Sequence, residues 1–218
     1  MSLLIFAATE REWHPLRTKL EEKGWTKTAV PPKFICTGPG LTNATFTITR
    51  SIIELKPSLA LQIGIAGSYA DSYPTGTAVA IESECLGDTG VWENENFKDL
   101  FDLGLLNADQ PPFENRMLPN PFLKKWTIDG IPLVRGVSVS EVTTRTADIE
   151  RQNQKYQAVS ESMEGAAFHY ACLCLGVPFL QLRGLSNSIG ERDKRKWEIE
   201  KSLDKVSEAA VRFLSQNL

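Results

Sequence analysis

Apolar and polar positions alternate along the chain in blocks that predict strands separated by helices. Residues 2–8 (SLLIFAA) and 59–67 (LALQIGIAG) are mostly apolar and show no alternation of polar and apolar positions, as expected for strands that are covered on both faces. Residues 41–56 (LTNATFTITRSIIELK) have the spacing of a helix instead, and Pro57 follows them. Strands that alternate with helices are typical of an α/β fold with a mostly parallel sheet.

The same alternation continues to the end of the sequence. Further strands are predicted over residues 34–37, 77–86, 132–140 and 179–187. Further helices are predicted from Glu10, capped by Thr9, to a stop at Gly24, and then near 145–155, within 162–176 and over 197–216. Pro15 leaves the start of the first helix uncertain.

The pattern degrades between residues 87 and 130. This stretch is acidic and rich in proline, and it predicts one long excursion with at most a short helix. No linker-like composition divides the chain, so residues 1–218 are expected to form a single domain.

Composition excludes several classes of protein. Of the 218 residues, 42% are hydrophobic and 23% are charged, which argues against a disordered chain, and the net charge is −3. A nucleic-acid polymer is therefore not expected as a partner, because its binders carry a basic surplus. No apolar run approaches the roughly 20 residues that span a bilayer. The first residues lack the basic region of a signal peptide, so a cytoplasmic protein without membrane contact is expected.

The cysteines and histidines predict no metal site. Two cysteines stand alone in apolar runs, two form a C-x-C, and none lies in a C-x-x-C. The only histidines, His14 and His169, lie far from any zinc-ligand spacing. The four cysteines are expected to be reduced, buried and hydrophobic in role, and neither a metal nor a cofactor is expected.

Two groups of small residues follow predicted strands. Gly38-Pro39-Gly40 lacks the G-x-G-x-x-G spacing of a dinucleotide loop and is interpreted as a structural turn. Ala66 and Gly67 end the buried strand 59–67. Open α/β sheets bind ligands at the carboxyl ends of such strands, so these two residues are candidates for a ligand site.

Four polar side chains in apolar or terminal positions are the remaining candidates. Glu164 precedes an apolar helical stretch, where it either favours the amino end of the helix or is a functional acid with Gly165 allowing a ligand close approach. Arg183 lies inside the apolar FLQLRGL and needs an acid or a polar ligand. Asn187 suits a turn and Glu12 suits the first turn of a helix, which are both ordinary structural roles.

Taken together, five blocks resemble the purine nucleoside phosphorylase and nucleosidase superfamily, and within it the nucleosidase branch. They are ATERE (8–12), TGPG (37–40), GIAGS (64–68), SMEGAA (162–167) and RGLSN (183–187). The tail SNSIGERDKRKWEI resembles futalosine hydrolases, the nucleosidases of the alternative menaquinone pathway. This resemblance implies a three-layer α/β/α fold with a central mixed, partly barrel-like sheet, and a homo-oligomer, in the first place a dimer.

The resemblance also implies roles for particular residues. Glu12 matches the acid that orients and deprotonates the attacking water, and Arg183 matches the residue that holds this water. Met163 and Glu164 match the ribose site, where the thioether packs on the sugar and the carboxylate accepts its hydroxyls. Ala66 and Gly67 match the small strand end over which the nucleoside lies.

Asn187 departs from the methylthioadenosine/adenosylhomocysteine nucleosidases, which have an aspartate at this position. An amide can donate to O6 and accept from protonated N7 of a 6-oxopurine, whereas adenine needs two acceptors. The implied reaction is therefore hydrolysis of the N-ribosidic bond of futalosine with release of hypoxanthine.

Several alternatives remain open at this stage. The chain could be a methylthioadenosine-type or aminofutalosine nucleosidase, or a phosphorylase that uses Arg183 and Ser68 as an anion site. It could also be a nucleoside-binding sensor without activity, because a fold does not fix a function. Arg116 and Arg145 are candidates for the subsite of a carboxylated 5′ substituent only because they lie in predicted loops.

Overall fold

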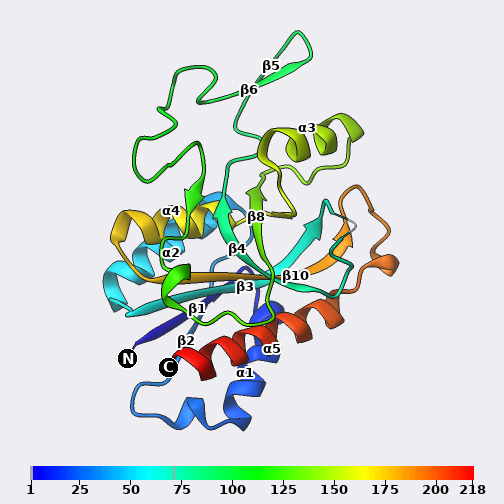
Figure 1. The fold of residues 1–218 in the computed structure, drawn as a ribbon. Helices are drawn as coiled ribbons and strands as arrows, with labels where there is room; N and C mark the ends of the chain where they lie inside the picture. The colour runs from blue at the N-terminus through cyan, green and yellow to red at the C-terminus, as the bar shows by residue number, and fades with distance from the viewer. Residues whose placement is uncertain (1, 71) are drawn as a thin grey trace.

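Helices pack against both faces of one central sheet (Figure 1). The computed structural model describes residues 2–70 and 72–218. The strands are β1 (Leu3–Ala7), β2 (Lys33–Cys36), β3 (Leu59–Ser68), β4 (Ala78–Glu84), β5 (Gly90–Glu93), β6 (Asn96–Asp99), β7 (Leu118–Pro119), β8 (Leu133–Ser138), β9 (Ser160–Ser162) and β10 (Phe179–Ser188). The α-helices are α1 (Glu10–Glu22), α2 (Leu41–Leu55), α3 (Thr146–Tyr156), α4 (Gly165–Leu175) and α5 (Ile199–Asn217).

The central sheet is mixed and partly closed. Its strand order is β10-β4-β8-β9-β3-β1-β2, and β3 pairs with β10 as well as with β9. Five strands therefore form a ring from which β1 and β2 extend. Strands β1, β2, β3 and β10 run parallel to one another, whereas β4 is antiparallel to β10 and β9 is antiparallel to β3. The expected mixed, partly barrel-like sheet between helices is confirmed.

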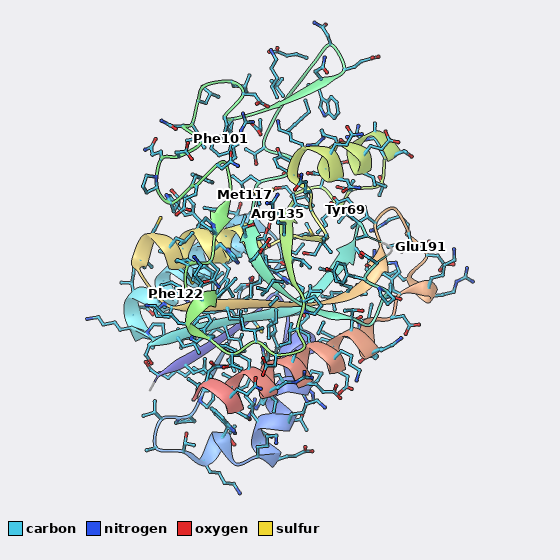
Figure 2. All side chains as sticks on the ribbon, in the orientation of Figure 1. Tyr69, Phe101, Met117, Phe122, Arg135 and Glu191 are labelled. Carbon is cyan, nitrogen blue, oxygen red and sulfur yellow. The ribbon has the colours of Figure 1, made fainter. Side chains whose placement is uncertain are left out.

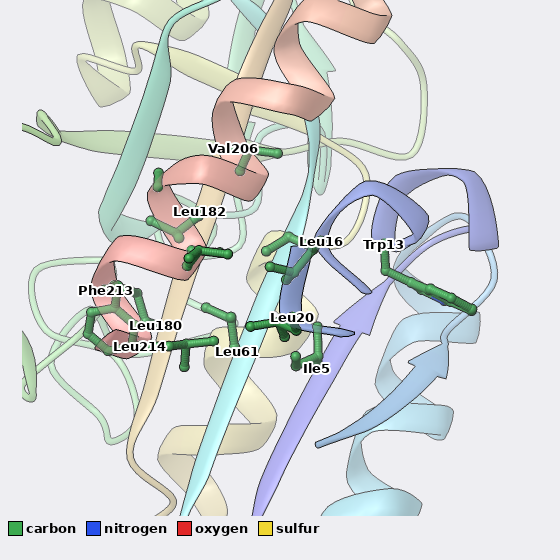
Figure 3. Packing of buried hydrophobic residues seen from close by; sticks show 14 of the residues in the cluster. Ile5, Trp13, Leu16, Leu20, Leu61, Leu180, Leu182, Val206, Phe213 and Leu214 are labelled. Carbon is green, nitrogen blue, oxygen red and sulfur yellow. The ribbon is translucent and has the colours of Figure 1, made fainter. Parts of the chain in front are cut away.

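Two of the hydrophobic clusters, called here the two cores, lie on opposite faces of the sheet and explain why its central strands are mostly apolar. Successive side chains of a strand point to opposite faces, so β1 contributes to both cores. Figure 3 shows one core, in which side chains of α1 and α5 pack on the sheet: Ile5, Leu16, Leu20, Leu61, Leu180, Leu182, Val206, Phe213 and Leu214. On the other face, α2 and α4 pack through Ile48, Ile52 and Phe168 against Leu4 and Phe6.

Helix α1 begins where the sequence predicts and passes through Pro15. Thr9 is its N-cap, with extended backbone, and the helix ends at Glu22 before Gly24, which has φ 78°. Pro15 removes one backbone donor but lies in the second turn, and the helix continues beyond it. The packing of Leu16 and Leu20 in the core holds this helix on the sheet despite the proline.

The excursion between residues 87 and 130 contains a hairpin that the sequence did not predict. Strands β5 and β6 pair with each other and form a sheet of their own at one end of the molecule (Figure 1). The guanidinium carbon of Arg151 in α3 lies 4.1 Å from the centre of the Phe97 ring, which fastens the hairpin to α3. The expected short helix is only a three-residue 3-10 turn at Leu123–Lys125.

The cysteines are free but not all buried. Cys85 and Cys172 are buried, as expected, whereas Cys36 and Cys174 are exposed, so the prediction of four buried cysteines is wrong for these two. Cys36 lies at the end of an edge strand, where solvent reaches one side of it. In the part of the chain that the structure describes, no helix is long and apolar enough to cross a membrane.

Candidate functional site

A cavity of about 460 Å³ opens at the carboxyl ends of β3 and β10. The ends of β1, β3 and β10 meet there because these strands run parallel. Tyr69 and Glu191, which follow β3 and β10 closely in the chain, are labelled in Figure 2 on this side of the molecule. The first turn of α1 and the segment between β9 and α4 complete the walls.

Six of the seven predicted site residues line this cavity. They are Glu12, Ala66, Gly67, Met163, Glu164 and Asn187. The seventh, Arg183, lies behind the wall and is only 1% exposed. Residues from α1, β3, β10 and the start of α4 are thus brought to one place, although up to 175 positions separate them in the sequence.

Glu12 is held at both carboxylate oxygens by backbone amides. The N–H of Thr9 donates to Oε2 at 3.0 Å, as in a helix capping box, and the N–H of Ile65 donates to Oε1 at 3.1 Å. Burial raises the pKa of Glu12 above its usual range, and the charge of Arg183 partly offsets this rise. The result is a fixed carboxylate whose pKa has moved toward neutral pH.

Arg183 has two polar partners, although its buried Nε makes no hydrogen bond. Its Nη2 donates to Oε1 of Gln62 on β3 at 3.2 Å, and it lies 3.9 Å from Oε2 of Glu164. Gly64, its register partner on β3, leaves room for it. A β-carbon on Gly64 would lie 2.5 Å from Nη1 of Arg183 and 2.7 Å from Oε1 of Glu12, so both charged groups face the same small space.

Glu164 is the N-cap residue of α4, but its side chain turns away from its own helix. The N–H of Gly40 donates to its Oε1 at 2.9 Å. The Gly38-Pro39-Gly40 segment is therefore a turn, as predicted, and it also aligns a carboxylate 124 residues further along the chain. Gly165 does not face the cavity, because its open side is filled by Glu84, and the suggested approach of a ligand at Gly165 is wrong.

Asn187 follows an irregularity in β10 that turns it into the cavity. The pairing of β10 with β3 shifts between Leu185 and Asn187, and Asn187 lies opposite Gly67. Its Nδ2 donates to the backbone oxygen of Ser188 at 3.0 Å, and its Oδ1 accepts from the hydroxyl of Ser186 at 2.9 Å. Each end of the amide retains one unused hydrogen-bonding position.

Further residues of the cavity were missed in the sequence. Glu161 is 5% exposed and lines the wall, where its Oε1 accepts from the N–H of Thr143 at 3.0 Å and its Oε2 accepts from the hydroxyl of Tyr69. The one feature of the sequence that could have indicated a role for Glu161 in the site is its position directly before the SMEGAA block. Arg11 and Trp197 also line the cavity.

The two arginines suggested for a 5′ subsite lie elsewhere. Arg116 pairs with Asp99 and Asp102, and Arg145 pairs with Asp148. Neither belongs to the cavity-lining residues in the described part of the chain, so that suggestion is wrong. Loop position alone does not predict which arginines face a site, because acidic neighbours hold these two in place.

Comparison with known proteins decides the family. The family model described as "Phosphorylase superfamily" matches residues 7–217. The chain belongs to this superfamily. It is 33% identical over 190 residues to a futalosine hydrolase of Thermus thermophilus, and the match covers 84% of this chain and 81% of that protein. The chain is thus similar to a nucleosidase over most of its length, and the resemblance to futalosine hydrolases seen in the sequence is confirmed.

Solved structures of two nucleosidases have the same fold. A 5'-methylthioadenosine/S-adenosylhomocysteine nucleosidase from Helicobacter pylori superposes with a TM-score of 0.77 at 19% identity, covering 99% of this chain and 98% of that one. A futalosine hydrolase from Helicobacter pylori gives a TM-score of 0.74 at 18% identity, covering 100% and 97%. The architecture is therefore that of the nucleosidases of the superfamily.

Proposed function

We propose that this superfamily member hydrolyses the N-ribosidic bond of futalosine and releases hypoxanthine and dehypoxanthine futalosine, as a step of menaquinone biosynthesis. The observation that carries the proposal is the orientation of the Asn187 amide, which leaves one donor and one acceptor free at the cavity. The similarity to a futalosine hydrolase over most of the chain supports it.

The charge of the cavity suits cleavage of a glycosidic bond. Such a reaction passes through a transition state with oxocarbenium character, in which the sugar becomes positive. Three carboxylates, those of Glu12, Glu161 and Glu164, stand in the cavity wall. Fixed negative groups around a developing positive charge lower the barrier without having to reorganise.

Glu12 serves as the general base toward water. Its two oxygens are oriented by Thr9 and Ile65, and the raised pKa of Glu12 makes it a stronger base than an exposed glutamate. Arg183 faces the same small space and holds the water beside Glu12. Glu164, aligned by the amide of Gly40, accepts the ribose hydroxyls, and Met163 packs on the sugar.

Asn187 recognises the leaving base above the small strand end formed by Ala66 and Gly67. As the bond breaks, N7 gains negative charge and takes a proton from water, while Glu12 returns the proton of the attacking water to solvent. A 6-oxopurine then presents an acceptor at O6 beside a donor at N7. The free N–H of Nδ2 and the free lone pair of Oδ1 match this pair. An adenine presents two donors and leaves the free N–H unmatched, which disfavours the methylthioadenosine and aminofutalosine alternatives.

The 5′ substituent of futalosine is an aromatic group with a carboxylate, and the cavity offers groups of matching chemistry. Arg11, whose guanidinium also pairs with the exposed Glu200, contributes a cation, and Trp197 contributes an indole ring. A guanidinium pairs with a carboxylate, and an indole packs on an aromatic ring. We assign the 5′ subsite to this part of the wall.

Phosphorolysis is the weaker alternative. The hydroxyl of Ser68, which was considered for an anion site, donates to the backbone oxygen of Ala70 at 3.1 Å. Arg11 is the one cationic side chain among the described residues that line the cavity, against three carboxylates. Phosphate would be repelled from such a wall, so water is the nucleophile of the proposal.

We further propose that the protein is a homodimer in the cytoplasm. Phe46 and Ile53 on α2 are 65% and 55% exposed, and Tyr170 and Leu175 on the adjacent α4 are 43% and 38% exposed. A second copy covering these two helices would remove their apolar side chains from water. Light scattering in solution tests the dimer, and Phe46→Glu is expected to shift it to the monomer. Four free cysteines fit a reducing compartment.

The proposed function is tested by product analysis. Purified protein is incubated with futalosine in phosphate-free buffer and again with phosphate, and the products are separated by chromatography. Release of hypoxanthine and the free sugar product in both buffers supports hydrolysis. A phosphate requirement with formation of a sugar phosphate would support the phosphorylase instead, and no release of base would support a sensor.

A further inference from the structure

A buried carboxylate that has no part in the proposed reaction lies directly beneath the site. Glu84 ends β4 and is 1% exposed. Its Oε1 accepts from Nε2 of Gln181 at 2.8 Å, and its Oε2 accepts from the hydroxyl of Ser138 at 3.1 Å. Burying a carboxylate is costly, so its retention at this place calls for a role.

Ser138 connects this carboxylate to helix α4. The N–H of Ala166, the second residue of α4, donates to Oγ of Ser138 at 2.7 Å. The first turn of a helix has backbone N–H groups without partners inside the helix. Ser138 satisfies one of them, and Glu84 orients Ser138 by accepting its hydroxyl hydrogen. Glu84 therefore acts on the start of α4 through one intermediate.

Glu84 also contacts the start of α4 sterically. A β-carbon on Gly165 would lie 1.8 Å from Oε1 of Glu84, and a β-carbon on Gly136 would lie 2.7 Å from the same oxygen. Gly165 is the first residue of α4 and follows Glu164 directly. The glycine of the SMEGAA block is thus required because the backbone of α4 rests on this carboxylate.

We propose that Glu84 is a positioning residue that, through Ser138 and Gly165, fixes the first turn of α4 and so aims the Glu164 carboxylate at the ribose. This role rests on the proposed function, in which Glu164 accepts the ribose hydroxyls. The Glu164 carboxylate accepts a hydrogen bond from the amide of Gly40. The backbone that follows Glu164 is fixed by Ser138, which Glu84 orients. Displacement of the helix start moves Glu164 relative to the sugar.

The test uses Glu84→Ala and Ser138→Ala, with Glu84→Gln as the conservative variant. Glu84→Gln keeps an oxygen for the Ser138 hydroxyl, and Gln181 can turn its amide to present its unpartnered oxygen to the new NH2 group. Glu82→Ala is the matched control, because Glu82 lies on the same strand but its side chain is 43% exposed. Far-UV circular dichroism of each variant checks the fold.

The decisive readout is the ratio of kcat/KM for futalosine to kcat/KM for its 2′-deoxy analogue. A misplaced reacting group can cost about 100-fold, so we expect kcat/KM for futalosine to fall by about that factor in Glu84→Ala and Ser138→Ala. The 2′-deoxy analogue lacks a partner of Glu164 and loses less, so the ratio falls at least about 10-fold. Glu84→Gln and Glu82→Ala keep the wild-type ratio.

Two outcomes would overturn the role of Glu84. One is an unchanged ratio in a folded Glu84→Ala, or in Ser138→Ala if the first variant does not fold. The other is hydrogen exchange of the Ala166 amide at the wild-type rate in Glu84→Ala, since we expect it to exchange at least about 10-fold faster. If the wild type does not cleave futalosine, the proposed function fails on its own, and the exchange measurement still decides whether Glu84 holds α4.

Discussion

Nδ2 of Asn187 donates a hydrogen bond to the backbone oxygen of Ser188 at 3.0 Å. A backbone oxygen can only accept, so this contact establishes which end of the amide is the nitrogen. The Ser186 hydroxyl then donates to the other end, Oδ1, at 2.9 Å. In the proposed function the amide therefore meets a purine with a defined order of donor and acceptor, and this order would determine the choice of base.

Replacing Asn187 with aspartate is expected to reverse the base preference. Asn187→Asp removes the donor for O6 and leaves two acceptors, which suit the 6-amino group and protonated N7 of adenine. Unpaired buried polar groups can change specificity by about 10⁴-fold, so we expect kcat/KM for futalosine to fall by up to that factor. Activity toward methylthioadenosine should appear or rise at the same time.

Asn187→Ala is the control for this exchange. It removes both the donor and the acceptor, so kcat/KM should be low for both futalosine and methylthioadenosine and should rise for neither. An Asn187→Asp variant that retains the wild-type rate with futalosine would contradict the role of the amide.

Gly64→Ala is expected to damage catalysis more than stability. The added β-carbon would lie within 2.7 Å of both Nη1 of Arg183 and Oε1 of Glu12, which are the ends of side chains and can shift. A shift of about 1 Å in a catalytic group can cost about 100-fold in rate. We expect such a loss in kcat with a folded protein, measured by steady-state kinetics and thermal unfolding. Equal kcat in the variant and the wild type would contradict the claim that catalysis depends on the space beside Gly64 that Arg183 and Glu12 share.

The rate is expected to fall on acidification at a higher pH than an ordinary glutamate would cause. The proposed reaction requires the base form of Glu12, and burial raises the pKa of Glu12, so its protonation as pH falls begins above the usual glutamate range. The acidic limb of kcat/KM against pH measures this pKa. Glu12→Gln should lower the rate by about 10²-fold or more at all pH values and abolish the limb, whereas the exposed Glu10→Gln should leave it unchanged. A wild-type profile without an acidic limb above pH 4.5 would exclude Glu12 as the base.

Glu84 is expected to make the fold less stable as pH rises. Burial raises the pKa of Glu84 to about 7, so the folded state binds a proton that the unfolded state releases near pH 4.5. The free energy of unfolding therefore falls by about 3 kcal/mol from this group as pH rises from about 4 to 8. Glu84→Gln has no carboxyl group to titrate, so its free energy of unfolding should rise relative to that of the wild type as pH increases. Chemical denaturation at several pH values measures this difference. Parallel curves for the two proteins would contradict the shifted pKa.

The parts of the fold that lie in the cores could be predicted from the sequence. β1 is fully apolar and β3 is apolar except for Gln62 and Ser68, because each strand contributes side chains to both cores, so the residue types themselves indicate burial. The hairpin β5–β6 could not be predicted, because all four residues of β5 are exposed and leave no alternation. β9 was missed as well, since Ser160–Ser162 is a short, polar and buried strand.

Helix α4 shows the limit of periodicity. Tyr170 and Leu175 are exposed although they belong to this apolar stretch, and the buried side of the helix contains Phe168 and His169. A helix that is apolar all round gives no periodic indication of which side faces the core.

The residues of the candidate site could be predicted from short blocks of sequence, whereas the contacts that hold these residues in place could not. Glu12 and Asn187 lie in blocks that can be recognised without a structure. The contacts of Gly40 with Glu164 and of Ser138 with Ala166 join residues 124 and 28 positions apart. Such pairings depend on the closure of the sheet, which local pattern does not encode.

Selection of a 6-oxopurine by the site is tested most directly by comparing the rates of cleavage of three nucleosides. Purified wild-type protein is assayed in parallel with futalosine, inosine and methylthioadenosine, and kcat/KM is determined for each. We expect release of hypoxanthine, with futalosine as the best substrate and methylthioadenosine as the poorest. A clear preference for methylthioadenosine would contradict it.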